Sequence, residues 1–228
     1  MTKKLTTKSL IKEALSLEYF QPVMCEIAIP VTYLPGTGPL VLAVGDNASG
    51  KSFFRRVIQG RCGFNKIECI HLSMEGRRNV AYNPGLCFVY GSEDYQSTGQ
   101  NSTETVLGAI RTSKGREEPH VLFWDEPDFG LSESWSASMG VEIANGMTTE
   151  VNPNLVAAFV VTHSRPLMKP LIELDPHVLI FDEGFPTSLQ EYLDRPIVIR
   201  PLQELKDLSH KRFKRIQRIL DLRKAKKK

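Results

Sequence analysis

The sequence predicts an α/β fold in which helices pack around a mostly parallel central sheet. Apolar runs of strand length alternate with segments of helical periodicity, as in strands joined by crossover helices. With 41% hydrophobic and 24% charged residues, the chain has the composition of an ordinary globular protein. Its 228 residues suffice for a sizeable core, so we expect one large domain over residues 1–200 and a basic amphipathic helix and tail over 201–228.

The elements follow from periodicity and from turn residues. Apolar runs predict strands at 24–29, 39–44, 67–72, 86–90, 120–124, 156–162 and 177–182. Apolar residues at helical spacing predict helices at 5–17, 50–59, 101–112, 132–146 and 202–225. Glycine, proline and polar clusters predict loops at 35–38, 76–85 and 112–119.

A glycine-rich stretch, GDNASGKS, connects the expected strand 39–44 to the expected helix 50–59. Its residues are Gly45, Asp46, Asn47, Ala48, Ser49, Gly50, Lys51 and Ser52, and their spacing is G-x-x-x-x-G-K-[ST]. The backbone N–H groups of such a turn and of the helix N-terminus form a nest for phosphate. Lys51 would place its charge on the β and γ phosphates, and Ser52 would offer its hydroxyl to Mg²⁺. A plain strand-to-helix turn is the alternative interpretation.

Two adjacent acids, Asp125 and Glu126, follow the apolar run 120–124. Parallel strands end at one edge of the sheet, so these acids would lie at the same edge as the glycine-rich stretch. We expect Asp125 to hold Mg²⁺, directly or through water. Glu126 would point elsewhere and orient or deprotonate an attacking water. A solvated acidic loop is the alternative.

Both stretches resemble motifs of the ABC-type ATPases, a superfamily of P-loop NTPases. GDNASGKS resembles their Walker A, and DEPDFGLS, residues 125–132, resembles their Walker B, catalytic glutamate and D-loop, the last of which includes Asp128 and Ser132. The family also has a switch histidine at the end of a later strand. His163, 37 residues after Glu126, stands in that place and follows the run 156–162. A structural histidine at a strand end is the alternative.

The family's signature, commonly LSGGQ, is similar to residues 96–100, QSTGQ, in degenerate form. Gln96 stands where leucine is expected, and Thr98 replaces the first glycine. The resemblance implies that Ser97, Gly99 and Gln100 contact the γ phosphate bound by a second subunit. A helix N-terminus of this composition supplies donors for an anion, whereas a polar loop that caps a helix is the alternative.

The resemblance covers residues 24–183 and implies an ABC-type ATPase domain with ATP and Mg²⁺ as cofactors. It implies that Lys51, Glu126 and His163 are catalytic and that a homodimer with composite sites forms on ATP binding. Hydrolysis would then act on a protein or nucleic-acid partner. An ATP-gated dimerisation module with negligible turnover and the ATP-binding subunit of a transporter are the alternatives.

Only 45 residues separate Lys51 from Ser97, so the helical insert is reduced. Transporter ATPases place a longer helical subdomain there, and the chromosome-maintenance branch places a coiled-coil arm. The chain therefore resembles the compact non-transporter members found beside DNA-repair, mobile-element and phage-defence proteins. Two family features stay open: the ring that stacks on adenine is Tyr19, Phe20 or Tyr33, and Gln96 is the nearest match to the coupling glutamine.

Other nucleotide-binding classes fit the sequence less well. Residues 65–68, NKIE, are close to the N-K-x-D of GTPases, but they precede their strand and end in Glu. A small-molecule kinase would use the same phosphate nest and leave Glu126 and His163 unexplained. The four cysteines, Cys25, Cys62, Cys69 and Cys87, lack close C-x-x-C pairs, and we interpret them as thiols rather than as metal ligands.

Charge is concentrated at the C-terminal end. Residues 206–228 hold eleven Lys or Arg and two Asp, whereas the other 205 residues hold 18 basic and 24 acidic groups. The expected helix 202–225 carries an apolar stripe that Arg212 interrupts; its members are Leu205, Leu208, Phe213, Ile216, Ile219 and Leu220. Its cations predict contact with nucleic-acid phosphates, and a docked final helix with a solvated face is the alternative.

The sequence carries no uncharged 18-residue apolar run and no continuous apolar segment of a secretory signal. We therefore expect a cytoplasmic protein with no membrane partner.

Overall fold

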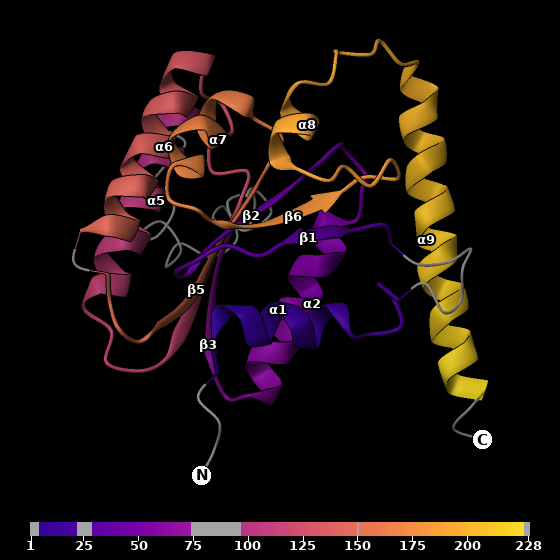
Figure 1. Ribbon diagram of the computed structural model, residues 1–228, viewed down its shortest axis with the longest axis horizontal. Helices are drawn as coiled ribbons and strands as arrows, with labels where there is room; N and C mark the ends of the chain where they lie inside the picture. Colours follow the sequence, from indigo (N-terminus) through magenta and orange to yellow (C-terminus); the bar gives the residue numbers. More distant parts are fainter. Residues whose placement is uncertain (1–4, 22–28, 74–96, 150, 226–228) are drawn as a thin grey trace.

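Six strands form one sheet in the described part of the chain, in the order β1-β6-β2-β5-β4-β3 (Figure 1). The computed structural model describes residues 5–21, 29–73, 97–149 and 151–225. The strands are β1 (Thr32–Leu34), β2 (Leu40–Gly45), β3 (Glu68–Ser73), β4 (His120–Asp125), β5 (Leu155–Thr162) and β6 (His177–Phe181). β1 is antiparallel to β6, and the other neighbouring strands are parallel. The α/β fold with a mostly parallel sheet is confirmed.

Helices flank this sheet on both sides. They are α1 (Thr7–Leu15), α2 (Lys51–Phe64), α5 (Thr98–Lys114), α6 (Glu133–Thr148), α7 (Arg165–Ile172), α8 (Leu189–Leu193) and α9 (Leu202–Ala225). The strands expected at 39–44, 67–72, 120–124, 156–162 and 177–182 are confirmed within one residue at each end. The expected strand 86–90, residues 24–28 of the expected strand 24–29, and most of the insert before Ser97 lie outside the described residues. Ile29 is described and is not in a strand.

Three elements were not expected: β1, α7 and α8. The sequence of α7 contains Pro166 and Pro170, which argues against a helix. Pro166 lies in the first turn, where a missing N–H costs nothing, and Ser164 caps the helix by accepting a bond from the Leu167 amide. Burial of Leu167 and of Leu171 on the sheet then holds the short helix in place.

Several predicted boundaries differ from the structure by two to five residues; α5, for example, begins at Thr98 rather than at 101. The helix expected at 50–59 continues to Phe64, because Gly60 and Gly63 face open space while Cys62, on the same helix, is fully buried. The loop expected at 112–119 begins later, because α5 continues to Lys114.

Two apolar layers enclose the sheet, one on each face. Alternate residues of the central strands pack with α5, α6, α7 and α8 on one face, and the residues between them pack with α1 and α2 on the other (Figure 1). Helix α6 approaches α7 closely at Gly140, where a Cβ atom would lie 2.3 Å from the Leu167 carbonyl oxygen. Because both faces are covered, β2 is buried along its whole length.

Helix α9 lies beside this sandwich and joins it through the second layer. Ile219 is buried among the residues that pack with α1 and α2, whereas Leu202 and Phe213 are largely exposed. Figure 1 shows α9 as a long helix at the edge of the domain, after a loop that follows α8. The docked-helix interpretation therefore describes the C-terminal part of α9.

In the parts of the chain that the structure describes, none of the helices has both the length and the apolar content to cross a membrane. Cys62 and Cys69 are free thiols, and Cys25 and Cys87 lie outside the described residues.

Candidate functional site

The glycine-rich turn, the two adjacent acids and His163 lie where the parallel strands end. β5 lies between β2 and β4, so the turn after Gly45, the acids after Trp124 and the histidine after Thr162 leave the sheet at the same edge. The register pairs Val44 with Thr162, and Asp125 with Val161. Polar groups at the carboxyl ends of neighbouring parallel strands lie in the crevice where α/β proteins bind ligands.

The glycine-rich stretch folds into a tight turn that needs its glycines. Gly45 and Gly50 have φ angles of 151° and 109°. A Cβ atom on Gly45 would lie 2.6 Å from the Phe181 carbonyl oxygen, and one on Gly50 would lie 2.7 Å from Ile29 Cγ2. Ala48 also has a positive φ, 58°, which is uncommon for a residue with a side chain. Left-handed residues beside a helix N-terminus turn successive N–H groups toward one point, as anion-binding nests do.

Lys51 is buried within this turn at the start of α2. Its residue surface is 7% exposed, and Nζ donates to the carbonyl oxygens of Gly45, at 2.6 Å, and Asp46, at 2.9 Å. Burial lowers the pKa of the Lys51 ammonium, while the nearby carboxylates of Glu126 and Asp125 raise it. The lysine and both acids are therefore electrostatic neighbours. Ser52, the next residue, is exposed.

Glu126 and His163 form a pair beside the turn. His163 Nδ1 lies 3.4 Å from Glu126 Oε1. Glu126 has a φ of 54°, and its amide donates to the Val161 carbonyl at 2.9 Å, so its left-handed backbone is held against β5. Strained backbone of this kind gathers at functional sites. The bond to His163 lowers the pKa of Glu126, and the same bond raises the pKa of His163.

The pair predicts a change in the titration of His163. In Glu126→Gln, we expect the His163 pKa, measured by NMR, to fall toward its ordinary value because the carboxylate that stabilises the imidazolium is gone. The stabilisation from His163 is present below its ordinary pKa and is lost as pH rises through the raised one. The stabilisation from Glu126 is present above the ordinary pKa of a glutamate and is lost as pH falls through the lowered pKa of Glu126. Both side chains are partly exposed, so the pair stabilises by about 1 kcal/mol or less.

His163→Asn identifies the resonance among the five histidines of the chain. An unchanged His163 pKa in Glu126→Gln would contradict the pairing.

Asp125 forms an ion pair with Arg55, which in turn contacts His71. The sequence did not predict either residue as part of the site. Arg55 of α2 places Nε 3.9 Å from Asp125 Oδ2, and its Nη1 lies 2.6 Å from His71 Nε2 of β3. Arg55 is one turn after Lys51, on the same side of α2, which is the only signal that the sequence offers. The Asp125 side chain keeps 18% of its surface exposed.

Asp125 and Ser52 fit a magnesium ion in number and chemistry. The described residues contain no group of three or more His, Cys, Asp or Glu that could hold a metal ion. Mg²⁺ needs no such group, because it is bound through one or two protein oxygens together with phosphates and waters. One carboxylate and one exposed hydroxyl are therefore a sufficient protein contribution.

The predicted signature residues lie at the start of α5. Ser97 is the N-cap: its Oγ accepts from the Gln100 amide at 3.3 Å, and Gln100 Oε1 accepts from the Ser97 amide at 2.9 Å. The capping interpretation is confirmed for both side chains. A Cβ atom on Gly99 would lie 2.8 Å from Leu131 Cδ2, and Ser102 Oγ donates to the Phe129 carbonyl at 2.7 Å.

The start of α5 thus forms one surface with the predicted D-loop. Within that loop, Asp128 Oδ1 accepts from Thr162 Oγ1 at 3.4 Å. Ser132 is the exposed N-cap residue of α6, with its Oγ 3.2 Å from Ser134 Oγ.

The three aromatic candidates for adenine stacking already have partners in the domain. Tyr19 packs edge-on against Phe53, and Phe20 packs against Phe53 and Phe54 in the buried layer. The Tyr33 hydroxyl lies 2.9 Å from His177 Nδ1, and the two rings stack.

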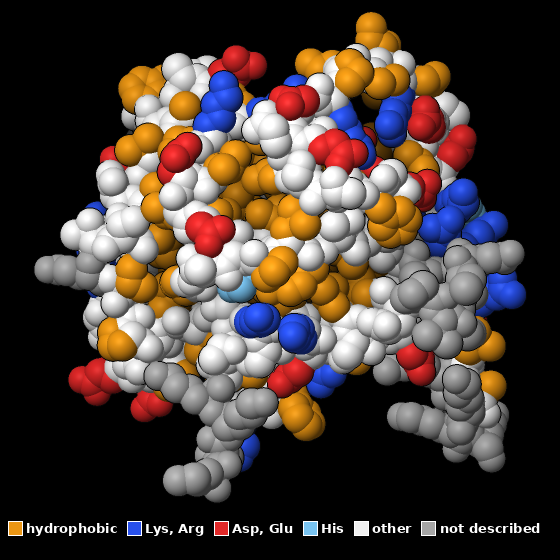
Figure 2. All heavy atoms as spheres, viewed as in Figure 1, with side chains coloured by type: hydrophobic (Ala, Val, Ile, Leu, Met, Phe, Trp, Pro, Cys, Tyr) orange, Lys and Arg blue, Asp and Glu red, His pale blue; other side chains and the backbone are white. Residues whose placement is uncertain are grey.

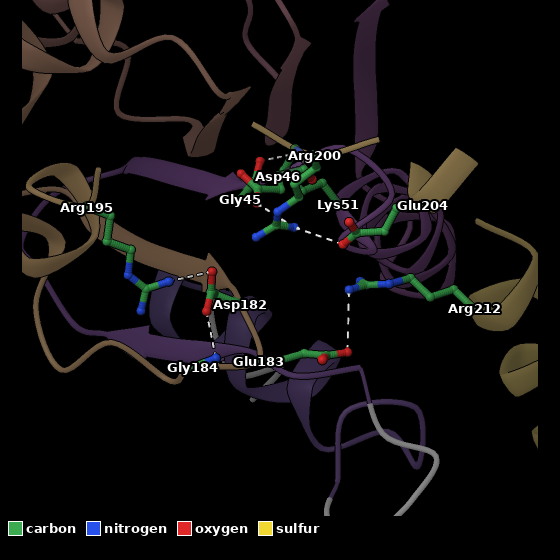
Figure 3. Close-up of polar contacts among 10 residues, drawn as sticks. All are labelled: Gly45, Asp46, Lys51, Asp182, Glu183, Gly184, Arg195, Arg200, Glu204 and Arg212. Carbon is green, nitrogen blue, oxygen red and sulfur yellow. Dashed lines mark hydrogen bonds and ion pairs between the residues drawn. The ribbon is translucent and has the colours of Figure 1, made fainter. Parts of the chain in front are cut away.

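A cleft of about 1070 Å³ opens between the site and the segment that leads into α9. Asp46, Glu126 and His163 line one wall, and residues 195–198 and 200–202, together with Leu205 and Leu208 of α9, line the opposite wall. Two ion pairs join the opposite wall to the loops after β6 and β2: Arg195 contacts Asp182 at 2.6 Å, and Arg200 contacts Asp46 at 3.6 Å (Figure 3). These arginines were not predicted as site residues.

The wall from the α9 side is apolar at the surface. Its residues Ile197, Val198 and Leu202 are 86%, 64% and 82% exposed, and Ile199, which does not line the cleft, is 96% exposed. Figure 2 shows hydrophobic side chains on the surface of the loop before α9.

A scan against protein-family models and searches of curated proteins and of solved structures found no match to this chain.

Proposed function

We propose that the chain binds ATP with Mg²⁺ at the edge of the sheet and hydrolyses it, as a compact non-transporter ABC-type ATPase. The observation that carries the proposal is the meeting of a glycine-dependent turn, a buried lysine and two adjacent carboxylates at the ends of neighbouring parallel strands. Each part has a separate role in phosphoryl transfer, in which positioning and charge stabilisation supply most of the catalysis. Both the sequence motifs and their spatial meeting support the proposal.

The roles follow from what each side chain contacts. Lys51 would exchange its bonds to the Gly45 and Asp46 carbonyls for bonds to the β and γ phosphates. Ser52 and Asp125 would hold Mg²⁺, which when bound neutralises charge on the phosphates.

Glu126 and His163 would contact the attacking water and the γ phosphate. Glu126 would orient the water and accept its proton, and the imidazole of His163, which contacts Glu126, would lie beside the same phosphate.

The second subunit is also part of the proposal. The start of α5 and the D-loop share one surface, so a two-fold partner would bring Ser97, Gly99 and Gln100 together with Ser132 to the opposite site. Because the side chains and the amides of Ser97 and Gln100 bond to each other in the helix cap, the α5 N-terminus would bind the γ phosphate chiefly through the backbone N–H groups between these two residues. The cycle would act on an effector protein or a nucleic acid in the cytoplasm.

A second candidate is an ATP-gated dimerisation module with negligible turnover. The Glu126–His163 pair favours it, because a carboxylate engaged with a histidine is a weaker proton acceptor.

The direct test measures nucleotide binding by calorimetry and phosphate release by a coupled assay. We expect binding of ATP with Mg²⁺ and release that chelation of the metal abolishes. GTP as the sole ligand, or failure to bind ATP and ADP at millimolar concentration, would contradict the proposal.

A further inference from the structure

One face of α9 turns toward the domain, and Arg212 lies at its centre. Leu208, Arg212, Ile216 and Ile219 follow each other at helical spacing along this face. The Arg212 side chain is 17% exposed, whereas its neighbours in sequence, Lys211 and Phe213, are exposed. The residue that interrupts the apolar stripe is therefore directed inward.

The guanidinium of Arg212 is largely buried but is only weakly paired with a carboxylate. Its Nη2 lies 3.8 Å from Glu183 Oε1, and Arg215 Nη1 lies at the same distance from the same oxygen. Glu183 is itself 59% exposed. Arg212 Nη1 is buried and has no hydrogen-bond partner among the described residues. Among the described residues, the two arginines thus share one solvated carboxylate within ion-pair distance, which is costly for the more buried of the two.

Arg212 interacts electrostatically with the glycine-rich turn. Burial lowers the pKa of Lys51 and the charge of Arg212 lowers it further. Burial also lowers the pKa of Arg212, while the carboxylates of Asp182 and Asp46 raise it. Residues 182–184 follow β6, whose Phe181 pairs in register with Gly45 of the turn. Figure 3 shows Arg212 reaching from α9 toward Glu183 in this loop. The loop after β6 therefore begins beside the glycine-rich turn and is contacted by the inward face of α9.

We propose that Arg212 is a phosphate-binding residue of the nucleotide site, supplied by α9 of the same subunit to the polyphosphate of a bound nucleoside di- or triphosphate. This inference rests on the proposed function. A phosphate oxygen would supply the acceptor that Nη1 lacks, in a geometry that guanidinium and phosphate share. Nucleic acid is disfavoured as the ligand of Arg212, because this side chain faces inward while Lys211, Lys214 and Arg218 are exposed.

The experiment compares Arg212→Gln with Arg215→Gln. Both substitutions remove one positive charge from the same helix and the same carboxylate partner. Binding of AMP, ADP, ATP and inorganic tripolyphosphate is measured by calorimetry with Mg²⁺. We expect Arg212→Gln to weaken binding of ATP, ADP and tripolyphosphate by about 10- to 100-fold, as for a charge-assisted hydrogen bond, and AMP much less. We expect Arg215→Gln to change all four by less than about 3-fold.

The outcomes separate this inference from the proposed function. If the unmodified protein binds no nucleotide, the proposed function is wrong. If it binds ATP and Arg212→Gln matches Arg215→Gln, Arg212 has no part in the site. Equal weakening of AMP and ATP in Arg212→Gln would indicate a structural role for the helix, and tighter binding would indicate that α9 obstructs the site; both overturn the inference. Thermal unfolding of each variant checks that the fold is retained.

Discussion

Phosphate release by Glu126→Gln is expected to fall by at least about 100-fold, while ATP binding is retained or strengthened. Glutamine keeps the size and the backbone of Glu126 but cannot accept the proton of the attacking water. It also removes a negative charge near Lys51 and the γ phosphate, since Glu126 and Lys51 are electrostatic neighbours. With ATP uncleaved, the closed dimer should accumulate. Single-turnover phosphate release and the molar mass by light scattering, with and without ATP, measure the two effects.

Glu133→Gln is the matched control. Glu133 lies at the exposed start of α6 and lines the same cleft, so its substitution removes the same charge from the same wall without touching the Glu126–His163 pair. We expect its turnover to stay within about 3-fold of that of the unmodified protein. Unchanged release in Glu126→Gln would defeat the hydrolase proposal and leave the dimerisation module. Lost release with no change in molar mass would defeat the composite site and leave hydrolysis by a single subunit.

The sheet was predictable because most of its strands are buried on both faces. β2, β4 and β5 each read as a continuous apolar run, and such runs have few other structures open to them. β1 failed this test because it has three residues, each only half-buried, and exists through its pairing with β6. α7 was missed because its two prolines argue against a helix in the local sequence. The packing of Leu167 and Leu171 in the core stabilises the helix despite them.

The site was predictable to the extent that it is local in sequence. The turn and the adjacent acids are short motifs, and the rule that parallel strands end at one edge brings them together. Arg55 and His71 were missed because they meet through the packing of α2 on β3, which no spacing encodes. Arg212 was visible as a charge in an apolar stripe, but only the docking of α9 shows where that charge points.

Lys51→Ala is expected to weaken ATP binding by about 100-fold or more, equivalent to about 3 kcal/mol, because two charge-assisted contacts to phosphate disappear. The fold should tolerate the change: the lost bonds to the Gly45 and Asp46 carbonyls are offset by relief from burying an ammonium. Arg56→Ala, on the exposed side of the same helix, removes an equal charge and should leave binding within about 3-fold. Calorimetry with ATP and Mg²⁺, together with thermal unfolding, measures both. Equal affinities for the two variants would mean that Lys51 contacts no phosphate. The glycine-rich stretch would then be a strand-to-helix turn that holds its lysine for packing alone.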